Sequence, residues 1–187
     1  GGHEALESTA SMLWVRFSPD GRRALFNRED PRTGNLDIWS LDLARGVEGR
    51  VTADPDTEAA GLLLPDGSLV YSDPRGASPQ IFRRDLGTGE TRELTPEGSF
   101  QMAQDLSPDS QTLVFAERIN YGAWDLFTIP TAGGPVTPLL TPPFDEIDLR
   151  LSPDGRFAAF VSNEPGRAEV YVAPFPNLGQ RTRVTQD

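Results

Sequence analysis

The chain has 187 residues and no cysteine, which excludes disulfides and thiolate metal sites, while 18 glycines and 17 prolines favour many turns over long helices. The net charge of −11 argues against binding to nucleic acid phosphates or to an anionic membrane surface, because both need a basic footprint. The sequence has no apolar run of about 18 residues for a membrane-spanning helix, and residues 1–10 have no apolar stretch like that of a signal peptide.

In chain order, the first predicted element is a hairpin in "FSPDGRRALF", residues 17–26, with a tight turn at its centre. The same phrase returns as "LLPDGSLVY" at 63–71, "LSPDSQTLVF" at 106–115 and "LSPDGRFAAF" at 151–160. The prolines of the four phrases (Pro19, Pro65, Pro108 and Pro153) are separated by 46, 43 and 45 residues. A period of roughly 40–50 residues is typical of propeller blades or of a solenoid.

Three further columns of residues keep this register. Aromatic residues end the second half of each hairpin: Phe26, Tyr71, Phe115 and Phe160. A second set of aromatic residues follows: Trp39, Phe82, Phe127 and Tyr171. An apolar residue plus threonine closes each copy: Val51-Thr52, Leu94-Thr95, Leu140-Thr141 and Val184-Thr185. The columns predict one structural unit written four times.

Each unit reads as four β-strands, because apolar residues alternate or form short runs between turn residues. The predicted strands are 13–17, 23–27, 36–42 and 49–52; then 59–63, 68–72, 80–85 and 91–95; then 101–106, 112–117, 124–130 and 136–140; then 146–151, 157–162, 169–174 and 181–185. The predicted fold is an all-β β-propeller of four four-stranded antiparallel blades, which is either part or half of a larger ring or a small closed ring.

The whole chain, 1–187, is therefore predicted to be a single propeller unit. Its blades are expected at about 11–52, 57–95, 100–141 and 146–185, with 1–10 as a candidate outer strand of a neighbouring blade.

The recurring aspartates are interpreted as turn-makers rather than as catalytic groups. Proline presets φ near about −65°, aspartate accepts from nearby backbone N–H groups, and glycine takes positive φ. The carboxylates concerned are Asp20, Asp66, Asp109 and Asp154. Ser110 replaces the glycine in the third turn, which we expect to be tolerated at a small cost.

These repeats resemble the WD40-like propeller repeat of TolB-like proteins, on "SPDG", the "DIWSLDL" strand and the closing "RVT" and "ELT". The resemblance covers residues 13–185 and implies a fold rather than an activity, because one fold hosts many functions. The repeats also resemble the propellers of prolyl-oligopeptidase-type peptidases, and "EVYVAPFP" at 169–176 resembles sensor regions of bacterial serine/threonine kinases. The resemblance implies a bacterial protein in a periplasmic or extracytoplasmic location.

The sequence offers little for catalysis or for metal binding. It has no G-x-S-x-G elbow, no phosphate-binding loop and a single histidine, His3, near one end. The glycine-rich segments 85–90 and 131–135 are interpreted as hairpin turns, and "FDEID" at 144–148 as a solvated link between blades rather than a cation site. We therefore predict no catalytic residue, no metal site and no cofactor.

The innermost strands of a propeller line its central channel, so a ligand site should draw on them. Counting back from each turn places Arg16, Asp105 and Arg150 in one layer, and Trp14 and Asp148 in another. These five residues are the candidate ligand-binding set. Arg150 and Asp148 are equally compatible with salt bridges between blades.

Three functional hypotheses remain open. The first is a non-catalytic interaction or ligand-sensing module of a larger bacterial protein, with a protein or peptide partner. The second is a propeller that gates access to a serine peptidase domain. The third is a self-assembling half-propeller, in which a second copy completes the ring as a homodimer; none of the three involves nucleic acid or membrane insertion.

Overall fold

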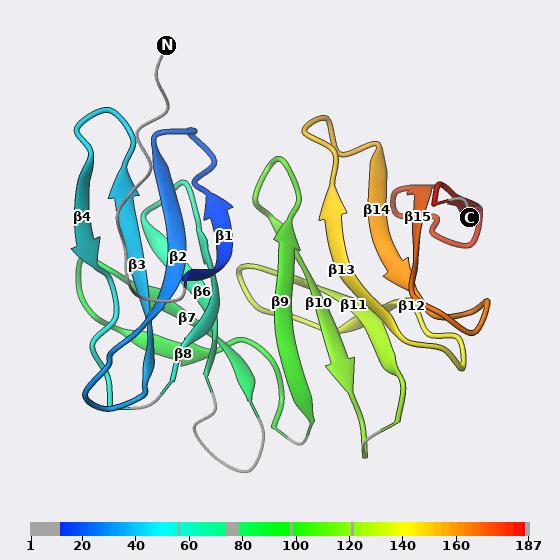
Figure 1. The fold of residues 1–187 in the computed structure, drawn as a ribbon, viewed down its shortest axis with the longest axis horizontal. Helices are drawn as coiled ribbons and strands as arrows, with labels where there is room; N and C mark the ends of the chain where they lie inside the picture. Colours follow the sequence, from blue (N-terminus) through cyan, green and yellow to red (C-terminus); the bar gives the residue numbers. More distant parts are fainter. Residues whose placement is uncertain (1–11, 56, 74–78, 98, 121, 186–187) are drawn as a thin grey trace.

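The computed structural model describes residues 12–55, 57–73, 79–97, 99–120 and 122–185. Within these ranges sixteen strands form four four-stranded antiparallel sheets, each with its strands in sequence order. Figure 1 shows the sheets as blades that fan around a common centre, with blades 1 and 4 on opposite sides. The predicted all-β propeller is confirmed. In the described ranges, no helix has the length and apolarity needed to cross a membrane.

Blade 1 contains β1 (Met12–Phe17), β2 (Arg23–Glu29), β3 (Leu36–Asp42) and β4 (Val47–Arg50). Blade 2 contains β5 (Ala59–Leu63), β6 (Ser68–Asp73), β7 (Gln80–Asp85) and β8 (Thr91–Glu93). Blade 3 contains β9 (Phe100–Leu106), β10 (Thr112–Arg118), β11 (Trp124–Pro130) and β12 (Thr137–Leu140). Blade 4 contains β13 (Glu146–Leu151), β14 (Phe157–Ser162), β15 (Glu169–Pro174) and β16 (Thr182–Arg183). The inner strands β1, β5, β9 and β13 pack on one another in that order.

The fourth strands differ most from the prediction, and β2 also extends two residues beyond it. β4 runs two residues earlier than predicted, and β8 and β16 stop before the closing threonine. The cause is the threonine itself, whose hydroxyl accepts the third-strand N–H that a further ladder bond would use. Thr52 accepts from Ile38 N at 2.9 Å, and Thr95 from Ile81 N at 3.1 Å. Thr185 accepts from Val170 N in the same way, so this threonine marks the exit from blades 1, 2 and 4; in blade 3, Leu126 pairs with Leu140 instead.

The turns between first and second strands confirm the interpretation of the aspartates. In the first turn, Asp20 accepts from the Ser18 hydroxyl at 2.5 Å and from Arg22 N at 3.0 Å. The third and fourth turns repeat this arrangement around Asp109 and Asp154. Ser110 adopts φ 58, the left-handed conformation that glycine takes in the other three turns.

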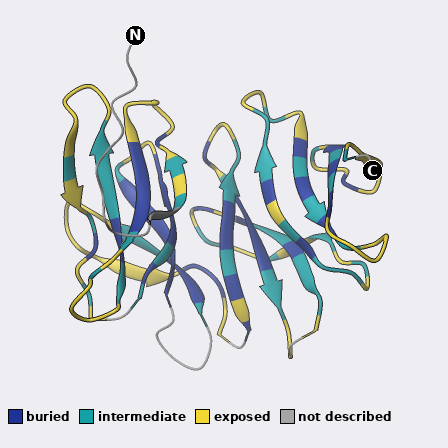
Figure 2. Ribbon diagram, in the orientation of Figure 1, coloured by how far each residue is buried: buried dark blue, intermediate teal, exposed yellow. Residues whose placement is uncertain are grey.

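The two aromatic columns explain how blades pack. In each of blades 2 to 4 the two aromatic rings of the blade lie near each other, with centroids 5.7–6.2 Å apart, on the face that meets the preceding blade. The opposite face carries aliphatic side chains that meet the following blade, such as Leu25 and Ile38 of blade 1 against Tyr71 of blade 2. Figure 2 shows that burial concentrates on the second strands and on the inner strands of blades 2 and 3, while the turns and outer strands are mostly exposed.

The outward faces of blades 1 and 4 carry apolar side chains that are more exposed than their equivalents at the junctions between blades. Val114 and Leu126, on the face of blade 3 that meets blade 4, are 0% exposed. Their equivalents on blade 4, Ala159 and Val170, are half-buried. At the other end Phe17 of β1 is 70% exposed. Both end faces therefore retain surface that resembles the inside of a blade junction.

One interpretation from the sequence needs correction. The link at 144–148 joins two blades, as predicted, but it is not solvated throughout. Glu146 is 0% exposed, and Asp145 accepts hydrogen bonds from Trp124 N and from the Asn163 side chain. These carboxylates serve the junction between blades 3 and 4. His3 and the expected outer strand at 1–10 lie outside the described residues.

Candidate binding site at the axis of the propeller

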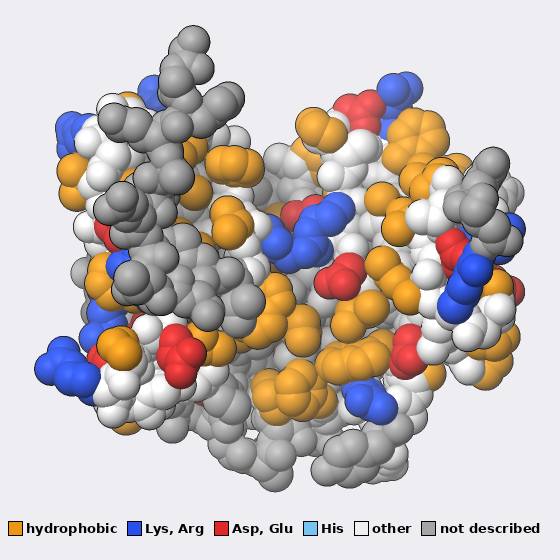
Figure 3. Space-filling view, in the orientation of Figure 1, with side chains coloured by type: hydrophobic (Ala, Val, Ile, Leu, Met, Phe, Trp, Pro, Cys, Tyr) orange, Lys and Arg blue, Asp and Glu red, His pale blue; other side chains and the backbone are white. Residues whose placement is uncertain are grey.

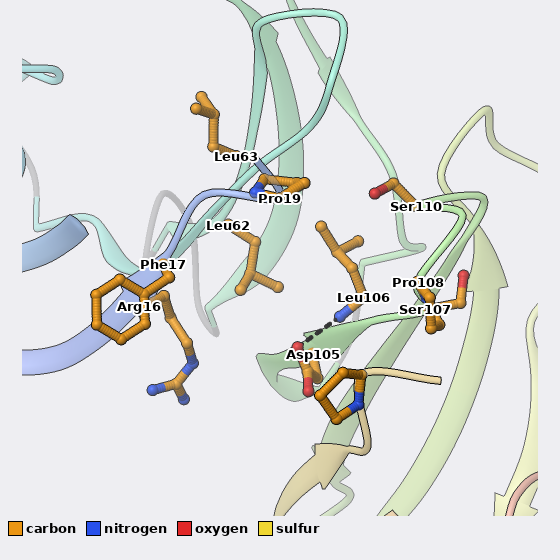
Figure 4. A pocket seen from close by; sticks show the side chains of 11 residues that line it. Arg16, Phe17, Pro19, Leu62, Leu63, Asp105, Leu106, Ser107, Pro108 and Ser110 are labelled. Atoms are coloured by element: carbon orange, nitrogen blue, oxygen red, sulfur yellow. Dashed lines mark hydrogen bonds between the residues drawn. The ribbon is translucent and has the colours of Figure 1, made fainter. Parts of the chain in front are cut away.

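A cavity of about 310 Å³ opens where the inner strands run into their turns. Figure 4 shows side chains from different blades around it, and its lining includes Arg16, Phe17, Leu62, Asp105, Ser110 and Pro153. All four blades contribute, because every inner strand leads into an SPDG-type turn at this end of the axis. The space-filling view in Figure 3 shows acidic and basic side chains together in the central hollow.

Arg16 provides the positive charge of this cavity. It is half-buried, and its Nη1 donates to the carbonyl oxygen of Val15 at 2.8 Å. Burial lowers the pKa of its guanidinium, and the negative charges of Asp105 and Asp148 oppose that shift. The side chain is therefore a partly desolvated cation held in the field of two carboxylates.

Asp105 faces the same cavity but is already engaged by backbone groups. Its Oδ1 accepts from Leu106 N at 2.9 Å, and its Oδ2 accepts from Leu151 N at 2.8 Å. Burial raises the pKa of this carboxyl, while the two backbone hydrogen bonds and Arg16 act in the opposite direction. Asp105 therefore joins the inner strands of blades 3 and 4 as well as lining the cavity.

Arg150 and Asp148 lie on β13, one on each side of Leu149. Arg150 is half-buried, and its Nη1 donates to the carbonyl oxygens of Gln104 and Leu149. This is a link between blades 3 and 4 made through backbone oxygens rather than through a carboxylate. Asp148 is exposed and adopts φ 56. Neither side chain is among those that line the cavity around Arg16.

Trp14 belongs to a different hollow. It lines an apolar cavity of about 360 Å³ near the opposite ends of the inner strands, together with Phe100 and Met102. The predicted set is therefore divided, with Arg16 and Asp105 at one mouth and Trp14 toward the other. Strand pleating alone does not account for this separation, because the pairing of β1 with β2 shifts register between Leu13 and Arg16.

A bulge of this kind recurs in every blade, and it was not predicted from the sequence. The pairing of first and second strands shifts register near the same place in all four sheets. Trp14, Ala60 and Asp148 occupy left-handed backbone conformations there, with φ of 50–56°. Bulges re-aim side chains and are frequent beside functional sites.

The sequence pattern also did not point to the residues at the mouth. Phe17, Pro19 and Ser110 line the cavity, although the turns they belong to were interpreted only as architecture. One signal could have revealed them. Parallel inner strands place their following turns at a single end of the axis, so the turns of a propeller converge.

The repeats match the family described as "TolB beta propeller domain" over residues 8–171. The chain belongs to the TolB β-propeller family. The match covers blades 1 to 3 and the first half of blade 4, up to β15, so it includes most of the repeat columns that predicted the fold.

Individual relatives agree with this assignment. The "Protein TolB homolog" of Chlorobium chlorochromatii (strain CaD3) is 30% identical over 172 residues, which is 86% of this chain and 38% of the relative. TolB from Acinetobacter baumannii superposes with a TM-score of 0.73 at 26% identity, over 92% of this chain and 43% of that one. The chain thus spans about two fifths of the length of these relatives.

A puromycin hydrolase shares the fold as well. It superposes with a TM-score of 0.67 at 19% identity, over 90% of this chain and 28% of the hydrolase. At that identity the likeness shows a common propeller architecture and says nothing of hydrolysis by this chain. It agrees with the resemblance to peptidase propellers.

Proposed function

We propose that this TolB-family chain is a non-catalytic binding module that holds a protein or peptide partner at the axial cavity. The observation that carries the proposal is the pairing of half-buried Arg16 with exposed Phe17 at a mouth shared by four blades. A guanidinium has five N–H donors and binds carboxylates or carbonyl oxygens strongly, especially where it is partly desolvated. Exposed aromatic rings supply the apolar area that dominates binding energy in protein interfaces.

The charge of the chain supports a partner with basic residues around its contact segment. The net charge is −11, so long-range attraction would bring a basic partner to the surface faster than a neutral one. Arg16 would then take an acidic or carbonyl group of the partner inside the cavity. Asp105 would shape the cavity rather than bind the partner, because its oxygens already accept hydrogen bonds from Leu106 N and Leu151 N.

Selection of a displayed random-peptide library on the immobilised chain tests the proposal without a known partner. Selected peptides should lose at least roughly tenfold in affinity with Arg16→Ala and with Phe17→Ala, a loss of about 1.4 kcal/mol each. Matched controls are Arg45→Ala, an exposed arginine on an outer turn, and Phe157→Ala, an exposed ring on β14. Equal losses with the controls, or no selected peptide, would reject the axial site.

The end faces favour a second candidate function, which is association with a second copy. Phe17 and Val15 of blade 1 are 70% and 52% exposed, and the aliphatic face of blade 4 is only half-buried. Head-to-tail contact of blade 4 with blade 1 of another copy would bury both. Light scattering tests this candidate, since a mass near twice 20.4 kDa supports the dimer and a mass of 20.4 kDa rejects it.

Gating of a peptidase rests on the shared fold alone. The sequence of the gene on either side of this segment tests it, because a gating propeller needs an α/β-hydrolase segment next to it.

A further inference from the structure

Two buried glutamates occupy equivalent positions in different blade junctions. Glu58 comes directly before β5, and Glu146 is the first residue of β13. Each lies the same distance in sequence before the proline of its turn, and each is 0% exposed. A carboxylate removed from water without a cationic partner strongly disfavours its charged form.

Glu58 lies between blades 1 and 2. Its Oε2 accepts from the Thr52 hydroxyl at 2.9 Å, and its Oε1 is buried without a hydrogen-bond partner. The surrounding charges are mostly negative and come from Asp54, Asp73 and Asp37.

A basic group also lies near this junction. Arg50 acts on Glu58 from a distance, but its guanidinium is bonded to Asp37 at 2.7 Å. Burial, assisted by the three aspartates and opposed by Thr52, raises the pKa of Glu58 from 4.5 to about 7.

Glu146 repeats this arrangement between blades 3 and 4. Its Oε1 accepts from the Ser162 hydroxyl at 2.9 Å, and its Oε2 is buried without a partner. Arg181 faces it from blade 4 but is bonded to Glu164 at 2.7 Å, and Asp125 adds a further negative charge from blade 3. Burial raises the pKa of Glu146 from 4.5 to about 7 as well.

Blade 3 has a neutral side chain at this position. Its equivalent residue is Gln101, a neutral amide that is 1% exposed and accepts from the Thr95 hydroxyl. The Gln101 amide nitrogen donates to Glu117 at 3.1 Å and to the carbonyl oxygen of Pro96 at 3.3 Å. A protonated glutamate has nearly the shape and the neutrality of this glutamine.

We propose that Glu58 and Glu146 form a proton-dependent device in the propeller, in which each neutral acid holds its blade junction together and each loss of a proton weakens that junction. The sign follows from the pKa directions. Because both values are raised in the folded chain, the folded state binds more protons than the unfolded state between about pH 4.5 and 7. The stabilising contribution is therefore fully present below the unfolded value, falls as pH rises through this window, and is lost above it.

Urea denaturation at about pH 5 and about pH 8 measures how the free energy of unfolding depends on the protonation of the two glutamates. With an unfolded value of 4.5 and a folded value of about 7, each glutamate should raise the unfolding equilibrium constant by about 70-fold between these two conditions. Glu58→Gln and Glu146→Gln should each remove one such factor, and the double variant should remove both. Gln101→Glu is the matched gain-of-function variant, and it should add a third pH-dependent factor.

The decisive comparison is between the glutamine variants and the unaltered chain. The proposal is overturned if the double variant keeps the full pH dependence, or if glutamine destabilises the chain equally at both pH values. Carbon-detected NMR titration of the two carboxyls in the unaltered chain provides a readout that does not depend on any variant folding. Midpoints for both carboxyls below about pH 5 would also overturn it.

Discussion

Replacing Asn27 by alanine removes a side chain that joins blade 1 to the inner strand of blade 2. Asn27 lies on β2 and is 1% exposed. Its Nδ2 donates to the carbonyl oxygen of Glu58, and its Oδ1 accepts from Ala60 N at 3.3 Å. In Asn27→Ala both of these backbone groups lose their partner inside the junction.

The magnitude follows from the number of groups left unsatisfied. A buried donor or acceptor without a partner costs about 1–3 kcal/mol, so two groups with partial relief by water predict a loss of about 2–4 kcal/mol. For a chain of this size that corresponds to a fall in melting temperature of roughly 5–15 °C. Blade 3 has Ala116 at the equivalent place, but there Gln104 Oε1 accepts from Leu149 N at 3.1 Å instead. Blade 1 has Val15 at the position of Gln104, and a valine side chain cannot accept a hydrogen bond in this way.

Urea and thermal denaturation followed by tryptophan fluorescence and circular dichroism measure the effect. Asn27→Ser is the matched control, because Ser72 occupies the same place in blade 2 and accepts from Ala103 N at 3.1 Å. It should retain a bond to Ala60 N and lose less stability than Asn27→Ala. A loss below about 1 kcal/mol for Asn27→Ala, or equal losses for the two variants, would refute the reasoning.

Three further outcomes follow from the same geometry. Phe115→Ala should cost about 3–5 kcal/mol, because the ring is 0% exposed, whereas Phe157→Ala, with 44% exposure, should cost less than about 1 kcal/mol; denaturant titration compares the two. Gly155→Ala should cost about 1–3 kcal/mol in thermal denaturation, because φ is +69° and a Cβ would lie 3.0 Å from the proline ring of the blade 3 turn; unchanged stability would contradict this contact. Ser107→Ala should raise the pKa of Asp109, because the Ser107 hydroxyl and a backbone N–H hold that pKa below its ordinary value of 3.8. The bond from Ser107 therefore stabilises the fold at pH values above 3.8 and is lost as the pH falls through the lowered pKa. NMR titration of Asp109 measures the change.

The sequence predicted the repeat, the blade number and most strand positions, because these depend on local alternation and on turn chemistry. Each copy of the four-stranded blade needs a tight turn after its first strand and aromatic residues that pack against the neighbouring blade, so these residues recur in the sequence. The ends of the fourth strands were harder to predict. They depend on whether the hydroxyl of Thr52 or of Thr95 replaces a ladder bond, which is a matter of side-chain geometry.

The candidate site was predicted less well than the fold. Counting back from the turns placed Arg16 and Trp14 in different layers of one candidate set, but the bulge in β1 separates them further, and the two line different cavities. Arg150 was expected in the channel or in a salt bridge, and it donates to backbone carbonyl oxygens of the blade 3–4 junction. A bulge leaves no consistent residue type in the sequence, since Trp14, Ala60 and Asp148 all adopt its left-handed conformation.

The sequence by itself determined that four similar sheets would form, because apolar periodicity and turn residues act within a single blade. Only the tertiary structure decided what lies between the blades, including the burial of Glu58 and Glu146 and the meeting of four blades around one cavity. The physical reason is that burial and electrostatic field depend on groups from both sheets of a junction, such as Asp37 of blade 1 and Asp73 of blade 2 around Glu58, and the position of those groups is set by how one sheet packs on the next.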